Sequence, residues 1–297
     1  MFKGTYVALV TPFADGAVDF RALDELVDYV IAGGVSGLVP CGTTGESPTL
    51  SDEEQAQIIA AVVKRSRGRV PVLAGAGSNC TEHALALAQA AMKAGAMGVM
   101  IVSPYYNRPS PRGLYQHFSY LASALGAPMV LYNIPGRTGV EIPVETIARL
   151  RADHSNIVAV KHATGSIDGA SELAAASDIA ILSGDDTLTA SLMAVGAVGS
   201  VSVVANLMPR ETAALTTAAL AGDLNAARAA HQKLFPVARA LMRLDTNPVP
   251  IKTALALGGM MAEEFRLPLC PMEPARRREL QTIVAPLLGA LPARQPA

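Results

Sequence analysis

The sequence has little charge, few aromatic side chains and no tryptophan. Of its 297 residues, 16% are charged and 4% aromatic, whereas 51% are hydrophobic. Soluble domains ordinarily carry about 25% charged residues, so the surface of this protein is poor in charge. We therefore expect a large core, or a chain that hides further surface by self-association.

Long hydrophobic runs are also missing. A membrane-spanning helix needs about 20 consecutive apolar residues, whereas the run over residues 96–102 is broken by a glycine and ends at Ser103. Thr11 and Asp15 interrupt the first apolar stretch, which argues against a secretory signal. The sequence therefore predicts a cytoplasmic protein that does not bind a membrane.

Cysteine is scarce, and the three residues Cys41, Cys80 and Cys270 are odd in number and widely spaced. This pattern excludes a disulfide framework. The five histidines show no HExxH or comparable spacing, so neither a metal site nor a metal cofactor is expected. A net charge of −1 with scattered basic residues argues against nucleic acid as a partner.

The chain does contain a repeated alternation of short apolar runs and longer helical segments. The predicted strands are residues 6–10, 37–40, 71–74, 98–102, 129–132, 157–161, 179–182 and 199–203. They are continuously apolar, as strands buried on both faces are. Eight strand–helix repeats predict an α/β fold, the (β/α)₈ TIM barrel. An open doubly wound sheet is the alternative, but no GxGxxG turn follows the first strand.

The segments between the strands are predicted to be helices. Residues 19–32 have one apolar face, and Ser51 with Glu54 three positions later forms a capping-box pattern. Towards the end of the chain three helices follow one another without a further strand, at residues 223–243, 251–257 and 275–288. We therefore expect a catalytic barrel over residues 1–222 and a C-terminal helical region over residues 223–297.

In such a barrel the active groups lie at the carboxyl ends of the strands. Among them, Lys161 follows a buried apolar strand, where desolvation disfavours the charged ammonium. A neutral lysine amine is a nucleophile that forms Schiff bases with carbonyl compounds. The alternative is a lysine whose ammonium group reaches solvent from the strand end.

Several other strand-end residues suit the same chemistry. The hydroxyls of Tyr132, Tyr106 and Thr44 can pass protons, although half-buried tyrosines are also common in cores. Residues 42–45 form a Gly-Thr-rich turn whose N–H groups suit an anion. Arg137 suits a carboxylate, and its alternative role is a salt bridge at the surface or at an interface.

Two further features favour structural roles. Asp185 and Asp186 could bind Mg²⁺, but no companion carboxylate supports this, and a helix-capping or structural role is favoured. Lys252 also follows apolar residues, but Pro248 and Pro250 predict that it lies where a loop becomes a helix.

Longer motifs extend over nearly the whole chain: GTTGE at residues 42–46, PYY at 104–106, YNIPGRTG at 132–139, and Lys161 followed by ATG at 163–165. With these motifs the chain resembles the dihydrodipicolinate synthase / N-acetylneuraminate lyase family of class I aldolase-like enzymes. At Arg137 the chain resembles the synthase branch of this family, because the sialic acid and keto-sugar acid aldolases usually lack an arginine at this position.

The resemblance implies a lyase mechanism. Lys161 would form a Schiff base with pyruvate, whose carboxylate Thr43 and Thr44 would hold. The resulting enamine would attack L-aspartate 4-semialdehyde, and cyclisation would give 4-hydroxy-tetrahydrodipicolinate, a precursor of diaminopimelate and lysine. Tyr132, Thr44 and Tyr106 would form a proton relay, with Tyr106 supplied by a neighbouring subunit.

The resemblance also implies roles for three further residues and an assembly. Arg137 would position Tyr132 and bind the carboxylate of the aldehyde, while Gly184 and Val201 would line the pocket through their backbones. No metal or organic cofactor is implied, and the assembly would be a homotetramer built as a dimer of dimers. Alternatives are another pyruvate-dependent aldolase of this family, acting on a sugar or 4-hydroxy 2-oxo acid, and a barrel that binds a keto acid without turning it over.

The chain departs from the family pattern at two places. His162 stands where most synthases have an acidic residue, and strand alternation predicts that it points away from the barrel interior. Lysine-inhibited members carry two histidines and a glutamate where this chain has Asp52, Gln55 and His83. The resemblance therefore predicts weak or absent inhibition by lysine.

Overall fold

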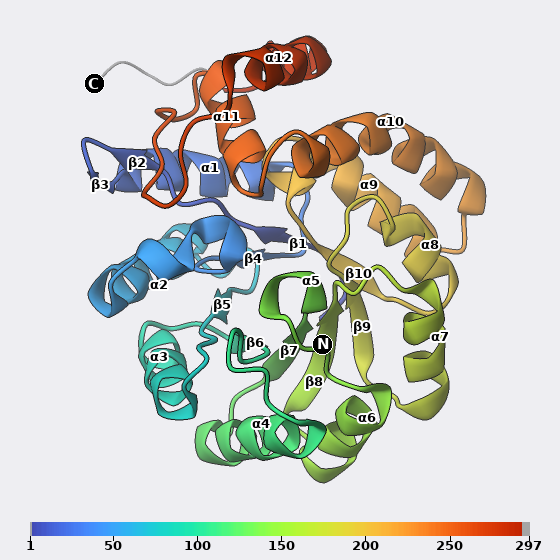
Figure 1. Cartoon of the computed structure of the whole chain (residues 1–297). Helices are drawn as coiled ribbons and strands as arrows, with labels where there is room; N and C mark the ends of the chain where they lie inside the picture. Colours follow the sequence, from blue (N-terminus) through green and yellow to red (C-terminus); the bar gives the residue numbers. More distant parts are fainter. Residues whose placement is uncertain (1, 293–297) are drawn as a thin grey trace.

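The computed structural model describes residues 2–292 and contains an eight-stranded parallel barrel (Figure 1). Its strands are β1 (Gly4–Ala8), β4 (Gly37–Val39), β5 (Leu73–Gly75), β6 (Gly98–Val102), β7 (Met129–Asn133), β8 (Ile157–His162), β9 (Ala180–Ser183) and β10 (Gly199–Ser202). They are hydrogen-bonded in the order β4-β1-β10-β9-β8-β7-β6-β5. A parallel bridge from Leu38 to Val72 joins β4 to the segment before β5 and closes the ring. The predicted TIM barrel is confirmed.

Helices surround the strands in Figure 1 and alternate with them along the chain. They are α1 (Phe20–Ala32), α2 (Asp52–Ser66), α3 (Thr81–Lys93), α4 (Pro111–Leu125), α5 (Pro135–Thr138), α6 (Val144–Asp153), α7 (Ile167–Ala176), α8 (Thr189–Ala194), α9 (Pro209–Leu220), α10 (Leu224–Arg243), α11 (Val249–Leu257) and α12 (Pro274–Leu288). The capping box that starts α2 is confirmed, since Ser51 Oγ accepts from the Glu54 N–H at 3.1 Å and Glu54 Oε2 accepts from the Ser51 N–H at 3.0 Å.

The structure corrects the predicted elements at some edges. The first strand ends at Ala8 rather than Val10. The last bond of its ladder runs from the Leu9 N–H to the Val39 carbonyl at 3.0 Å, and the next N–H, of Val10, donates to the Asn206 Oδ1 side-chain atom instead of to a strand. A short hairpin, β2 (Phe13–Ala14) with β3 (Ala17–Val18), was not predicted. Residues 2–292 also contain three 3₁₀ turns: η1 (Thr43–Gly45), η2 (Ser47–Thr49) and η3 (Val204–Asn206).

Strand alternation separates two sets of buried side chains. One set fills the barrel interior and includes Tyr6, Val130, Tyr132, Ala159, Ala163, Leu182 and Val201. Lys161 stands between Ala159 and Ala163 in alternation, so its side chain belongs to the interior. His162 points the opposite way, as predicted, and its Nε2 lies 2.8 Å from the Ser166 carbonyl oxygen at the start of α7.

The C-terminal helices follow the prediction. Helix α10 packs against α9, and α12 packs against α10 and α11; in Figure 1 α11 and α12 lie on the same side of the barrel as α1. The division between residues 222 and 223 stays a prediction. Across residues 2–292, no helix combines the length and the apolar character needed to cross a bilayer.

His117 of α4 is expected to make the fold less stable in acid. It is buried with Nδ1 2.9 Å from the Thr81 hydroxyl, and burial lowers its pKa from 6.5 to about 4. Between these values the unfolded chain binds a proton that the folded chain excludes, so stability falls as the pH drops from 6.5 to 4, by about 3 kcal/mol in all.

Urea titrations between pH 4 and 7 measure this effect. His117→Gln should flatten the dependence of the unfolding free energy on pH across that window. Thr81→Val is the matched control, because it removes the partner but keeps the imidazole, and it should retain the slope of the wild type. An unchanged slope in His117→Gln would show that another group causes the loss of stability at acid pH.

Candidate active site

Lys161 and Tyr132 come together at the ends of adjacent strands. They are partners in the parallel register of β7 and β8, and each side chain is 5% exposed. Lys161 Nζ lies 4.1 Å from the centroid of the Tyr132 ring. The structure thus places the buried Lys161 side chain beside the Tyr132 ring in the barrel interior.

Gly184 leaves room for the Lys161 side chain. A Cβ atom at this position would lie 3.1 Å from Lys161 Cε and 2.6 Å from the Cβ of Ala163, so a larger residue would push against both. Val201 is fully buried in the interior set that also holds Tyr132. Contact of Gly184 and Val201 with substrate stays a prediction.

The turn η1 presents two threonines near the same end of the barrel. Thr43 lines a cavity of about 340 Å³ together with Arg137 and Thr138, and it lines a second cavity of about 30 Å³ with Tyr132. Thr44 is buried. Within residues 2–292, the backbone N–H groups of Thr43 and Thr44 donate to no protein acceptor, which leaves them available to an anion.

Arg137 and Thr44 are linked by a residue that the sequence did not single out. Asn247 lies between α10 and α11, and its Nδ2 donates to Thr44 Oγ1 at 3.0 Å. Its carbonyl oxygen accepts from Arg137 Nη2 at 3.0 Å. The C-terminal region thus reaches into the site and contacts two of the predicted residues.

Among residues 2–292, the Tyr106 side chain makes no hydrogen bond to the other predicted site residues. Its side chain is 89% exposed, and its backbone has φ = 74°, a left-handed conformation that is uncommon for a bulky residue. Its N–H donates to the Thr138 carbonyl at 3.3 Å, which fixes the turn. Within the described part of the chain, no hydrogen bond joins its hydroxyl to Tyr132 or Thr44.

Asp186 supports the structural role expected for the acidic pair. Its carboxylate accepts from the N–H groups of Val203 and Val204, at 2.9 and 2.8 Å, and so caps the turn η3. Desolvation raises the pKa values of both Asp185 and Asp186. Among residues 2–292, no three His, Cys, Asp or Glu side chains are grouped so that they could hold a metal ion.

A buried ion pair fixes the end of η1. Lys252 Nζ lies 2.5 Å from Glu46 Oε1, both side chains have no exposed surface, and Lys252 also lies 4.3 Å from the centroid of the Phe13 ring. The predicted position of Lys252 at the start of a helix is confirmed by α11, but its partner, 206 positions away, was not predicted.

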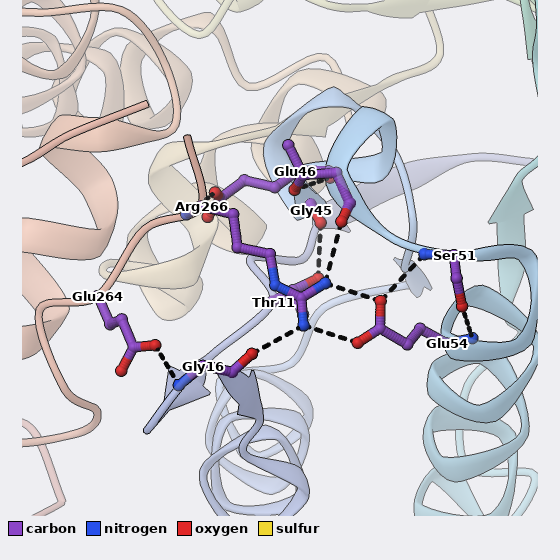
Figure 2. A network of polar contacts seen from close by, with 9 residues as sticks. Thr11, Gly16, Gly45, Glu46, Ser51, Glu54, Glu264 and Arg266 are labelled. Carbon is purple, nitrogen blue, oxygen red and sulfur yellow. Dashed lines mark hydrogen bonds and ion pairs between the residues drawn. The ribbon is translucent and has the colours of Figure 1, made fainter. Parts of the chain in front are cut away.

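Arg266 extends this network to the surface. Its backbone N–H donates to Glu46 Oε2 at 3.3 Å, while its guanidinium binds both carboxylate oxygens of Glu54 at 2.6 and 2.7 Å. Figure 2 shows the Arg266 side chain directed at Glu54 and at the Gly16 carbonyl. Arg266 therefore connects Glu46, in the loop after β4, to α2 and to the turn between β2 and β3.

Comparisons with known proteins agree with this arrangement. The model of the dihydrodipicolinate synthetase family matches residues 1–286. The 4-hydroxy-tetrahydrodipicolinate synthase of Pelobacter propionicus is 52% identical over 286 residues, which are 96% of this chain and 98% of that protein. The synthase of Geobacter sulfurreducens is 49% identical with the same coverage.

Solved structures give the same result. The dihydrodipicolinate synthase of Aquifex aeolicus has a TM-score of 0.95 and 44% identity, over 99% of this chain and 100% of that one. A monomeric dihydrodipicolinate synthase variant has a TM-score of 0.94 and 38% identity, over 98% of each chain. From the motifs at the strand ends, the barrel and these relatives, the chain belongs to the dihydrodipicolinate synthetase family.

Proposed function

We propose that the protein is a 4-hydroxy-tetrahydrodipicolinate synthase, a lyase that condenses pyruvate with L-aspartate 4-semialdehyde in the cytoplasm on the route to diaminopimelate and lysine. The observation that carries the proposal is the buried Lys161 amine, 4.1 Å from the centre of the Tyr132 ring at the end of two barrel strands. Relatives near 50% identity are named 4-hydroxy-tetrahydrodipicolinate synthases, which supports the same reaction.

Lys161 begins the reaction as the nucleophile. Its amine attacks the ketone carbon of pyruvate, and water leaves to give a protonated Schiff base. Loss of a methyl proton then gives an enamine, whose carbon attacks the aldehyde carbon of the second substrate. The amine of that substrate closes the ring on the imine carbon and releases Lys161.

The surrounding residues hold the substrates and move the protons. The free N–H groups of Thr43 and Thr44 receive the pyruvate carboxylate. Tyr132 accepts and returns protons beside Lys161. Arg137, which is exposed at the 340 Å³ cavity, binds the carboxylate of the aldehyde.

Tyr106 completes the relay from a neighbouring subunit. Its ring is exposed, and within residues 2–292 its hydroxyl makes no hydrogen bond to the site of its own chain. This suits a residue that acts in the site of a second copy. At least a dimer is then needed, and we propose a tetramer built as a dimer of dimers. An active monomer in solution would contradict this arrangement.

A substrate-resolved turnover assay tests the proposed reaction. Pyruvate consumption is measured with L-aspartate 4-semialdehyde, succinic semialdehyde and sugar aldehydes as acceptors. The proposal expects a clear preference for L-aspartate 4-semialdehyde, with formation of the cyclic product. Equal or faster turnover of the other aldehydes would favour a different pyruvate aldolase of the family.

Inhibition by free lysine is expected to be weak or absent. The 340 Å³ cavity holds Asp52, Gln55 and His83, and His83 Nε2 lies 3.1 Å from the Asp52 carboxylate. These groups replace those of the lysine-inhibited members. Initial rates at increasing lysine concentrations measure the effect, and inhibition as strong as in the sensitive enzymes would contradict the expectation.

A further inference from the structure

We infer that Asn247, from the segment between α10 and α11, is a positioning residue that orients the Thr44 hydroxyl for proton transfer. The inference rests on the proposed function of Thr44 as a member of the proton relay. Asn247 is not one of the residues that the family motifs of this chain contain, and it reaches the site only because the C-terminal region folds against the barrel.

In the contact between Asn247 and Thr44, the asparagine amide is the donor and the threonine hydroxyl is the acceptor. A threonine hydroxyl has one proton to donate and two lone pairs to accept with. Asn247 Nδ2 is a donor only, and it occupies one lone pair of Thr44 Oγ1 at 3.0 Å. Among residues 2–292 the Thr44 hydroxyl has no acceptor for its own proton, which therefore stays available to the relay.

The surroundings of Asn247 keep this arrangement in place. Asn247 is 7% exposed and Thr44 is 3% exposed, so water does not readily replace either group. Its carbonyl oxygen accepts from Arg137 Nη2 at 3.0 Å, so one residue holds both the threonine after β4 and the arginine after β7.

Packing alone does not account for an amide side chain at position 247. Its Oδ1 is buried and makes no hydrogen bond within the described residues. An unpaired buried acceptor is unfavourable, and each such group in a folded protein calls for an explanation. The explanation here is that the Nδ2 group of the same amide donates to Thr44.

Two substitutions of Asn247 test the inference. Asn247→Ala removes the donor, and Asn247→Asp keeps the shape but offers a carboxylate that accepts a hydrogen bond from the Thr44 hydroxyl, so that its proton is no longer available to the relay. Each should lower kcat by about 10- to 100-fold while the KM for pyruvate changes by less than about threefold, because the loss falls on proton transfer. A fall in kcat of less than about twofold in Asn247→Ala would overturn the inference.

Thr253→Val is the matched control in the same region. The Thr253 hydroxyl is buried in α11 and donates to Glu263 Oε1 at 3.0 Å, so this variant also loses a buried hydrogen bond of the C-terminal region but none to the site. Its kcat should stay within about twofold of the wild type. Thermal unfolding of all variants establishes that they are folded.

A double-mutant cycle separates positioning from a general structural effect. If Asn247 acts through Thr44, then Asn247→Ala should cause no further loss of kcat in a Thr44→Val background. The same fold-loss in both backgrounds would overturn the inference. Full turnover by Thr44→Val would instead overturn the proposed role of Thr44, so the two failures are distinguishable.

Discussion

Replacing Lys161 by arginine is expected to lower turnover by about 10⁴-fold or more, because a guanidinium cannot form the Schiff base. Arginine keeps the positive charge and much of the length of the side chain, so the loss reports the missing amine. Steady-state rates with pyruvate and L-aspartate 4-semialdehyde measure it. Lys93→Arg is the matched control, because Lys93 is exposed in the last turn of α3, and it should leave turnover unchanged.

Trapping with borohydride locates the nucleophile directly. The wild type reduced in the presence of pyruvate should carry a pyruvate-derived mass on the peptide that contains Lys161, and Lys161→Arg should carry none. Lysine is scarce in this chain, so assignment by peptide is simple. An adduct on the buried Lys252, or an adduct that persists in Lys161→Arg, would overturn the proposed mechanism.

The position of this nucleophile could be predicted because it depends on local patterns. A buried strand that ends in lysine fixes the height of Lys161 in the barrel, and alternation fixes the face to which it points. Parallel register then places Tyr132 of the neighbouring strand beside it. The same local patterns predicted the barrel, the capping box at Ser51 and the outward direction of His162.

The contacts of the C-terminal region could not be predicted in the same way. Asn247 meets Thr44 across 203 positions and Lys252 meets Glu46 across 206 positions. Neither residue has a spacing or a period that marks its partner, because both contacts arise only once the last helices pack on the barrel. The exposure of Tyr106 likewise depends on the turn that positive φ imposes at this residue.

Lys252→Met is expected to destabilise the protein by about 3–5 kcal/mol, because it leaves the Glu46 carboxylate buried without its partner. Burial lowers the pKa of Lys252 from its usual value, while the Glu46 carboxylate acts in the opposite direction. Methionine is close to lysine in length, so the core is filled and the loss comes from the charge. Urea titration at neutral pH measures the unfolding free energy.

Two further variants distinguish the unpaired charge from a loss of packing. In the double variant Lys252→Met with Glu46→Gln no buried charge remains, and most of the stability should return, because removal of both members of a buried pair is often close to neutral. The exposed pair of Arg243 and Glu279 is the surface control, and Arg243→Met should cost only about 0–1 kcal/mol. If Lys252→Met also cost so little, the buried pair could not be what holds η1, and the contacts of Asn247 with Thr44 and of the Arg266 N–H with Glu46 would have to carry that role.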